Sequence, residues 1–287
     1  MKLNTIYLIA CSLALASLAH AAEPLRVMSF NIRYGTAKDG ENEWSKRQEL
    51  VCSTIRNFDP DVLGVQEALA FQIDEIDAAI EGYQVVGVGR HDGRREGEFS
   101  ALLIKTDRCK VEESGTFWLS DTPEIPGSST WGNANIRVCT WASLRDNSDQ
   151  ETFHAYNTHW DHVSQPSREK SARLIVERIA ARQPAKTPVV LMGDFNVGEK
   201  DPAFLALIDS PLKLRDTFRL RHPDARDVGT FNGFRGETSG KKIDAILVSP
   251  EWKVVAAEID RSADGMRYPS DHFPVTATIE LRDHPRK

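Results

Sequence analysis

Two short apolar segments near the start of the chain read LRVMSFN at residues 25–31 and VLGVQ at residues 62–66. The first alternates apolar and polar side chains as a half-buried strand does, and the second is an apolar run of strand length. Between them, apolar residues recur at helical intervals from Leu50 to Phe58, and Asp59-Pro60 ends the pattern. This part of the chain therefore predicts a β-α-β unit in which both strands end at polar residues.

The helix of this unit should begin near Ser45, because Ser45 and Gln48 have the spacing of a capping box. A second helix is expected from Leu69 to Ile80, followed by a strand from Gln84 to Gly89. The first part of the chain therefore mixes helices with strands.

The middle of the chain consists mainly of strand-type segments. Four consecutive segments of strand type, separated by turns, predict an antiparallel run at 99–105, 109–119, 136–145 and 152–157. Later segments predict an amphipathic helix around 172–179 and further strands at 189–192, 243–248 and 275–279. Helices thus occur in both halves of the chain, so two mixed sheets covered by helices should pack face to face in a layered α/β sandwich.

Residues 1–22 have the composition of a secretory signal peptide, with Lys2 before an apolar run and small residues near the end. A membrane anchor is the first alternative, but the run is shorter than the roughly 20 residues a spanning helix needs. A lipid attachment at Cys11 is the second, but it leaves little apolar sequence before the cysteine. We expect a secreted or periplasmic protein. Its mature part, residues 23–287, should form a single domain, since it contains no linker, repeat or low-complexity run.

Composition narrows the possible functions. The net charge is −6, or −7 without Lys2, which argues against tight binding of duplex nucleic acid through a basic face. The mature part keeps an odd number of cysteines, Cys52, Cys109 and Cys139, with no CxxC or Cys/His cluster. Neither structural zinc nor a cysteine nucleophile is therefore supported.

Polar residues recur where the predicted strands end. They are Asn31, Glu67, Asn157–His159, Gly193–Asn196, Lys242–Asp244 and Ser270–His272. Strand ends are where α/β proteins place their sites. Each position alone is also typical of a turn or a cap. Six of them with carboxylate, amide and imidazole groups indicate one site.

The carboxylates suit the hydrolysis of a phosphate ester, in which charge accumulates on phosphate oxygens while water attacks phosphorus. Hard cations prefer oxygen ligands, and Mg²⁺ takes one or two carboxylates, which Glu67 and Asp271 could supply. Mn²⁺ is the alternative ion.

The remaining groups suit proton transfer and orientation. His159 and His272 can contact phosphate or move protons, and Asp244 can fix the tautomer of one imidazole. Asp194 and Asn196, two residues apart, can project to the same side and orient the attacking water.

In this order the motifs resemble those of the endonuclease/exonuclease/phosphatase superfamily: Ser29–Arg33, Gln66-Glu67, Asn157–His159, Gly193–Asn196, Ile243-Asp244 and Ser270–His272. The resemblance extends over nearly the whole mature part. It implies a four-layered α-β-β-α sandwich and a metal-dependent hydrolase. Residues 115–124 resemble the branch that contains secreted bacterial members and deadenylases.

The resemblance also implies which residues bind the ion and the phosphate. Glu67 would be the principal metal ligand, with Asn31 and Asp271 close to the same ion or a second one. Arg137 is similar to an arginine that binds phosphate in secreted members, although a lone arginine at a strand start is as often a surface charge.

The resemblance also implies which residues carry out the reaction. His272 would contact the phosphate, paired with Asp244. Asp194 and Asn196 would prepare the water and stabilise the transition state. His159 resembles the second active-site histidine, near the leaving group.

The substrate class is less defined by the sequence. We expect an exported phosphodiesterase that acts on a nucleic acid, a phospholipid head group or a phosphorylated sugar. The alternatives are an extracellular nuclease and a noncatalytic phosphate-binding module. No stable membrane insertion is expected, and the protein should be a monomer.

Specificity should lie in three loops, at 91–98, 121–135 and 226–241. Trp118, Trp131 and Trp160 are candidates for stacking on bases or sugars. They are equally typical of core or rim aromatic residues.

Overall fold

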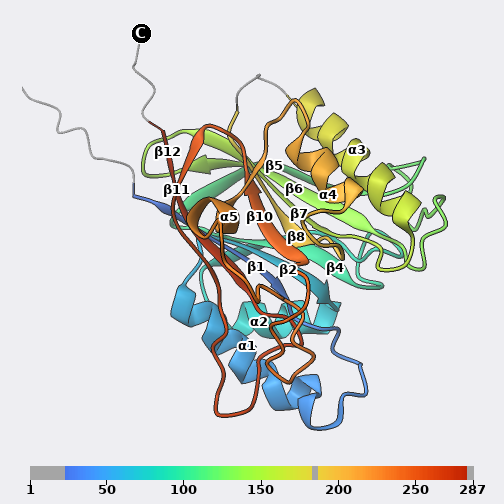
Figure 1. Ribbon diagram of the computed structural model, residues 1–287, viewed down its shortest axis with the longest axis vertical. Helices are drawn as coiled ribbons and strands as arrows, with labels where there is room; N and C mark the ends of the chain where they lie inside the picture. Colours follow the sequence, from blue (N-terminus) through green and yellow to red (C-terminus); the bar gives the residue numbers. More distant parts are fainter. Residues whose placement is uncertain (1–22, 183–186, 283–287) are drawn as a thin grey trace, which may run out of the picture.

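The computed structural model describes residues 23–182 and 187–282, and the expected signal segment, residues 1–22, lies outside the described residues (Figure 1). The strands form two six-stranded sheets. In sheet 1 they lie in the order β11 (Trp252–Ile259), β12 (Val275–Leu281), β1 (Leu25–Asn31), β2 (Val62–Ala68), β4 (Phe99–Lys105), β3 (Tyr83–Val86). In sheet 2 the order is β5 (Cys109–Trp118), β6 (Val138–Asp146), β7 (Thr152–His159), β8 (Val189–Asp194), β10 (Asp244–Val248), β9 (Arg215–Asp216).

Each sheet has one parallel pair among its described strands. These pairs are β1 with β2 and β7 with β8, and all the others are antiparallel. Parallel neighbours need a crossover connection, which is supplied here by α1 (Trp44–Phe58) and α3 (Gln165–Ala181). The expected mixed, mainly antiparallel sheets are confirmed.

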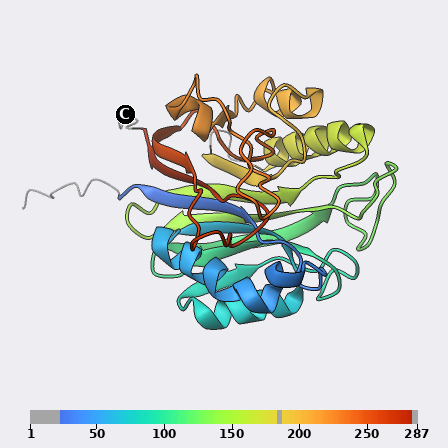
Figure 2. The same ribbon diagram turned by 60° about the horizontal axis from the view of Figure 1, so that its bottom comes forward.

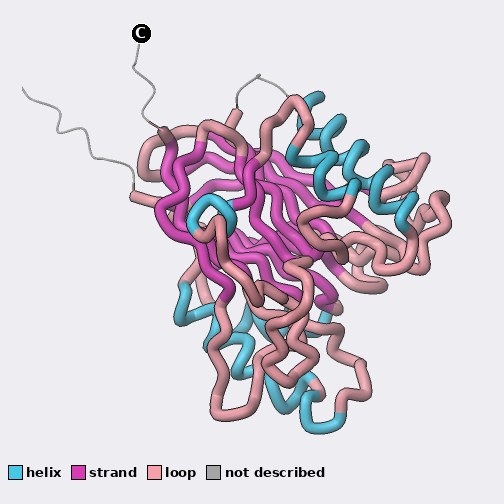
Figure 3. Tube along the Cα trace, in the orientation of Figure 1, coloured by secondary structure: helices cyan, strands magenta, loops and turns pink. Residues whose placement is uncertain are grey.

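The two sheets pack face to face, with helices on both outer surfaces (Figures 2 and 3). One apolar layer lies between the sheets, and one lies beneath the helices on each side. α1 and α2 (Ala70–Ala79) cover sheet 1, while α3 and α4 (Pro202–Ile208) cover sheet 2. No helix in the described ranges is long and apolar enough to cross a membrane. The expected four-layered α-β-β-α sandwich is confirmed.

The structure departs from the expected elements where sequence signals are short or interrupted. α1 begins at Trp44 with Glu43 as its N-cap and no side-chain capping bond, so the capping box expected at Ser45 and Gln48 is wrong. β11 escapes prediction because a bulge near Val254 breaks its alternation. The short elements η1 (Gly40–Asn42), α4, β9 and α5 (Thr217–Arg221) offer too few residues for a periodic pattern.

Gly193 allows β7 and β8 to pair at the end where the predicted site lies. Its φ is +153°, and a Cβ atom built there would lie 2.1 Å from the carbonyl oxygen of Thr158 in β7. No side-chain rotation relieves a clash with backbone. Glycine at this position therefore lets His159 and Asp194 stand opposite each other in register.

We expect Gly193→Ala to lower the free energy of unfolding by roughly 1–3 kcal/mol, because the added methyl group pushes β7 and β8 apart. Urea unfolding followed by circular dichroism measures the change. Gly240→Ala is the matched control, since a Cβ there meets no atom within 4 Å. Equal stability of the two variants would contradict this account of Gly193.

Candidate active site

The predicted site residues converge at one end of the sandwich. Seven of them line one pocket of about 550 Å³: Glu67, Arg137, His159, Asp194, Asn196, Asp271 and His272. Asn31 and Asp244 are buried behind it and bond to lining residues. The topology explains this convergence. β1, β2, β7 and β8 end at this edge, while β10 and β12 run antiparallel to their neighbours and begin there.

Glu67 lies in a β-bulge at the end of β2. The register between β2 and β4 shifts between Gln66 and Ala68, so Glu67 is the extra residue. Its φ of 63° is left-handed, a conformation that costs a non-glycine residue on the order of 1–3 kcal/mol. Its carboxylate accepts hydrogen bonds from Asn31 Nδ2 at 3.0 Å and from the backbone N–H of Tyr34 at 3.1 Å. The bulge thus directs Glu67 to the pocket.

Asn31 joins carboxylates from the two sheets. Its Nδ2 donates to Glu67 Oε1 at 3.0 Å and to Asp194 Oδ2 at 3.0 Å. Its Oδ1 accepts from the backbone N–H of Arg33, which fixes the amide orientation. The amide nitrogen therefore faces the carboxylates and orients them. Coordination of a metal by the Asn31 oxygen stays a prediction.

Asp194 is held by the turn that follows β8. The backbone N–H of Asn196 donates to Asp194 Oδ1 at 2.9 Å, and Asn196 Nδ2 donates to the Trp160 carbonyl at 2.9 Å. The other carboxylate oxygen, Oδ2, lies 3.5 Å from His159 Nε2 and 3.9 Å from His272 Nε2. Asp194 therefore stands between the two histidines.

Two overlapping groups of side chains could hold a metal ion. Glu67, His159 and Asp194 bring possible ligand atoms within 4.8 Å of one another, and so do Asp194, Asp244 and His272. Asp271 belongs to neither group, and its Oδ2 lies 3.7 Å from Arg33 Nε. Asp194 and His159, expected to act on water and on the leaving group, are thus also possible ligands.

The charge at this end of the sandwich suits a divalent cation. Burial and the neighbouring Asp244 carboxylate raise the pKa of Asp194 to about 7, and burial raises the pKa of Asp271. Buried carboxylates this close together are costly unless a cation offsets their charge. Carboxylate oxygens suit Mg²⁺ and Mn²⁺. The donor set therefore fits the expected ion.

His272 is held as a cation by its neighbours. Its Nδ1 lies 2.9 Å from Asp244 Oδ2. Burial lowers the pKa of His272, but the carboxylates of Asp244 and Asp194 raise it by more, so the pKa lies well above its usual range. A protonated His272 can donate a hydrogen bond from Nε2 into the pocket.

His159 is held neutral. Burial and the nearby guanidinium groups of Arg137 and Arg90 lower the pKa of His159 well below its usual range. Its Nδ1 lies 4.0 Å from Glu98 Oε2 and has no hydrogen-bond partner among the described residues. A neutral imidazole can accept a proton or bind a metal. The two histidines therefore differ in charge although both are buried.

Arg137 is a buried cation with unused hydrogen-bond donors. The residue is 3% exposed and lines the pocket. Its Nη2 lies 3.3 Å from His162 Nδ1, while Nε and Nη1 have no hydrogen-bond partner among the described residues. Nε lies 3.8 Å from the carboxylate of Asp161. Free guanidinium donors beside a pocket suit an anion such as phosphate.

Arg47 is a residue that the sequence analysis misses. It is 2% exposed and donates to the carbonyl oxygens of Ile32, Arg33 and Pro269 at 2.6, 3.1 and 3.0 Å. It thereby holds together the segments that follow β1 and precede β12. A charged residue four positions before Val51 on the apolar face of α1 is the signal that could have identified it.

All three loops expected to govern specificity reach the pocket. Its lining includes Glu98, Asn135, Phe231, Gly240 and Lys241. Glu98 is fixed by a bidentate ion pair with Arg90 at 2.7 and 2.8 Å. The sequence therefore located these loops without identifying the side chains that point inward.

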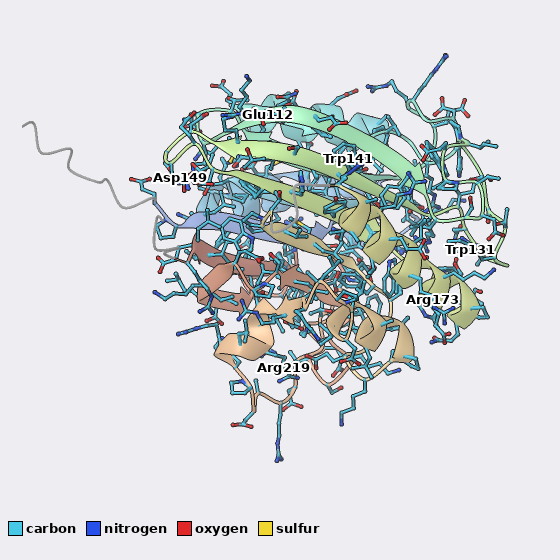
Figure 4. The ribbon with its side chains drawn as sticks, turned by 90° about the horizontal axis from the view of Figure 1, so that it is seen from above. Glu112, Trp131, Trp141, Asp149, Arg173 and Arg219 are labelled. Carbon is cyan, nitrogen blue, oxygen red and sulfur yellow. The ribbon has the colours of Figure 1, made fainter. Side chains whose placement is uncertain are left out.

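Two of the three tryptophans considered for stacking are core residues. Trp118 is 4% exposed and its Nε1 donates to the Arg90 carbonyl, while Trp160 is fully buried against Phe195. Neither can stack on a base or a sugar. Trp131 is partly exposed beside α3 (Figure 4), where its Nε1 donates to Asp121, and it does not line the pocket.

Comparisons with known proteins agree with this fold. Residues 28–272 match the model of the Endonuclease/Exonuclease/phosphatase family. An endonuclease/exonuclease/phosphatase from Bacteroides vulgatus is 33% identical in sequence, with a TM-score of 0.82 over 90% of this chain and 99% of that chain. A mannosyl-6-phosphatase from Bacteroides thetaiotaomicron is 32% identical, with a TM-score of 0.82 over 90% of this chain and 100% of that chain. The probable RNA exonuclease NGL3 of Saccharomyces cerevisiae is 25% identical over 190 residues, which are 62% of this chain and 37% of that protein.

We expect Asp244→Asn to lower the pKa of His272, because the variant removes the carboxylate that bonds to Nδ1. NMR titration of the histidine side chains in EDTA measures the pKa. Asp77→Asn, at an exposed position on α2, should leave it unchanged. An unaltered His272 titration in Asp244→Asn would show that the pair does not set the charge of this imidazole.

Proposed function

The chain belongs to the endonuclease/exonuclease/phosphatase family, whose members hydrolyse phosphate esters, and from this premise we propose that it is an exported, divalent-metal-dependent phosphodiesterase. The observation that carries the proposal is the group formed by Glu67, His159 and Asp194 on the wall of the pocket. Export is supported by the signal-like composition of residues 1–22. The mature chain would act as a monomer in the periplasm or outside the cell.

The proposed ion site uses the carboxylates that the sandwich gathers. Glu67 and Asp194 would hold the ion, with His159, Asn31 or Asp271 completing its contacts. When bound, Mg²⁺ supplies a Lewis acid that polarises the phosphate and acidifies a water molecule. Asn31 keeps both carboxylates in place through its amide nitrogen.

The other pocket residues would bind the phosphate and handle protons. Arg137 offers two unused donors to phosphate oxygens. Protonated His272, held by Asp244, would donate to a further oxygen as negative charge grows in the transition state. Neutral His159 would act on the leaving-group side.

A phosphorylated sugar is the second candidate substrate, because the mannosyl-6-phosphatase is among the similar structures. A nucleic acid is the third candidate substrate, and it would make the chain an extracellular nuclease. The similarity to the probable RNA exonuclease supports it, but the net charge of −6 does not favour it. A noncatalytic phosphate-binding module would be expected to lose some of the carboxylates and histidines, and this chain keeps all of those predicted.

We expect the purified mature chain to hydrolyse at least one of five substrates with Mg²⁺: bis-p-nitrophenyl phosphate, mannose 6-phosphate, DNA, RNA and sphingomyelin. Activity should vanish in EDTA and fall by roughly 10²-fold or more in Glu67→Ala, because a metal ligand is lost. Glu177→Ala, at an exposed position on α3, is the control and should keep full activity.

The substrate with the highest kcat/KM identifies the class, and a preference for mannose 6-phosphate would favour the sugar phosphatase. Turnover that survives both EDTA and Glu67→Ala would refute the metal assignment. Absence of turnover on every substrate, together with Mg²⁺ binding, would favour the phosphate-binding module.

We expect Arg137→Met to weaken the binding of inorganic phosphate by roughly 10- to 100-fold, because charge-assisted hydrogen bonds are lost. Isothermal titration calorimetry with phosphate measures the affinity. Arg173→Met is the control, since Arg173 is exposed on α3 (Figure 4). Similar phosphate affinities for the two variants would place Arg137 outside the phosphate site.

A further inference from the structure

Two residues from the predicted motifs have no part in the proposed chemistry. Gln66 precedes Glu67, and Asn157 lies two residues before His159. Both are 0% exposed. Their side chains meet between the sheets, next to an otherwise apolar layer.

The Asn157 amide connects sheet 2 to sheet 1. Its Nδ2 donates to the carbonyl oxygen of Val65 in β2 at 2.9 Å and to that of Ala101 in β4 at 2.7 Å. Its Oδ1 accepts from Gln66 Nε2 at 2.7 Å. The Asn157 amide group is therefore fully bonded, and all its bonds reach the opposite sheet.

Gly64 lets the two sheets approach closely at this point. A Cβ atom on Gly64 would lie 2.6 Å from Met192 Sδ and 2.9 Å from Asn157 Cγ. Both contacts are with side chains of sheet 2. The absence of a side chain on β2 thus makes room for the Asn157 amide between the sheets.

Hydrogen bonds and apolar contacts constrain a sheet interface differently. Apolar contacts are not directional, so they tolerate small sliding movements of one sheet over the other. Hydrogen bonds weaken steeply when distance or angle changes. Buried polar groups also specify one arrangement, because any other leaves them unpaired. The bonds of Asn157 therefore fix the relative position of β2 and β7.

We infer that Asn157 and Gln66 form a strut between the sheets that positions Glu67 against His159 and Asp194. The strut contacts β2 at Val65 and Gln66, directly before the bulge that carries Glu67. On the other side it belongs to β7, whose last residue, His159, stands opposite Asp194. The inference rests on the proposed function, since it concerns the distance between proposed metal ligands. Asn157 and Gln66 are positioning residues and do not touch the ion.

The test measures metal binding separately from stability. Mn²⁺ affinity is measured by electron paramagnetic resonance without substrate, and unfolding by urea is measured in EDTA. The variants are Asn157→Leu, Gln66→Met and the double variant, each close in size to the native side chain. Leu144→Ala is the control. Leu144 is fully buried in the same layer between the sheets but has no polar contact to β2, so its replacement lowers stability without removing a strut bond.

We expect Asn157→Leu to weaken Mn²⁺ binding by about 10- to 100-fold, as the loss of residues that orient metal ligands does. Leu144→Ala should bind Mn²⁺ as the parent chain does, although its urea midpoint also falls. The double variant should lose less stability than the two single variants added together, because both single variants remove the same bond between Gln66 Nε2 and Asn157 Oδ1. Its Mn²⁺ affinity should stay low.

Normal Mn²⁺ affinity in Asn157→Leu, an equal loss in Leu144→Ala, or recovery of affinity in the double variant would each overturn the inference. If the parent chain itself bound no Mn²⁺, the proposed function would fail. Hydrogen exchange at residues 65–68 would then test whether Asn157 and Gln66 hold the two sheets in position. Faster exchange in Asn157→Leu than in Leu144→Ala would support it, and equal exchange would overturn it.

Discussion

The amide of Asn31 is the contact on which the site depends, because it donates to a carboxylate from each sheet. Glu67 and Asp194 would repel each other if both were charged and unneutralised in a buried space. The surrounding structure brings them together against that repulsion. A strained bulge directs Glu67, a tight turn holds Asp194, and Gly193 lets β8, which carries Asp194, pair with β7. The cost of gathering this charge is consistent with a site that binds a cation.

The two buried histidines show how position, not residue type, sets chemical role. His272 faces Asp244 and Asp194, and these carboxylates raise its pKa. His159 faces Arg137 and Arg90, and burial together with these cations lowers its pKa. The imidazole on one side of Asp194 is thus favoured in its protonated form, and the imidazole on the other side in its neutral form. A pair of opposite charge states is what acid and base steps at one phosphorus require.

Sequence patterns predicted the strands and their polar ends, since each is a local signal. The bounds of β1 and β4 agree with those expected, and the polar residues at the ends of β2, β7 and β8 meet at one pocket, with Asn31 of β1 buried behind it. Features that depend on pairing between distant segments escaped prediction. The bulge at Glu67 needs β4 as its partner, and the approach of Asp194 to Glu67 needs both sheets. The role of Arg47 also escaped prediction, because one of its hydrogen-bond acceptors, the Pro269 carbonyl, lies far along the chain.

The position of β1 within sheet 1 affects the order in which the chain can fold. This strand lies in the interior of sheet 1, paired on one side with β2 and on the other with β12, which is the last strand of the described residues. A chain made from its N-terminus onward leaves one edge of β1 unpaired until residues 275–279 are available. Such distant pairing slows folding and leaves an open edge that other chains can join. The last residues of the site, Ser270 to His272, arrive with the same segment. Partly synthesised chains would therefore lack part of the site and be prone to association until β12 has paired with β1.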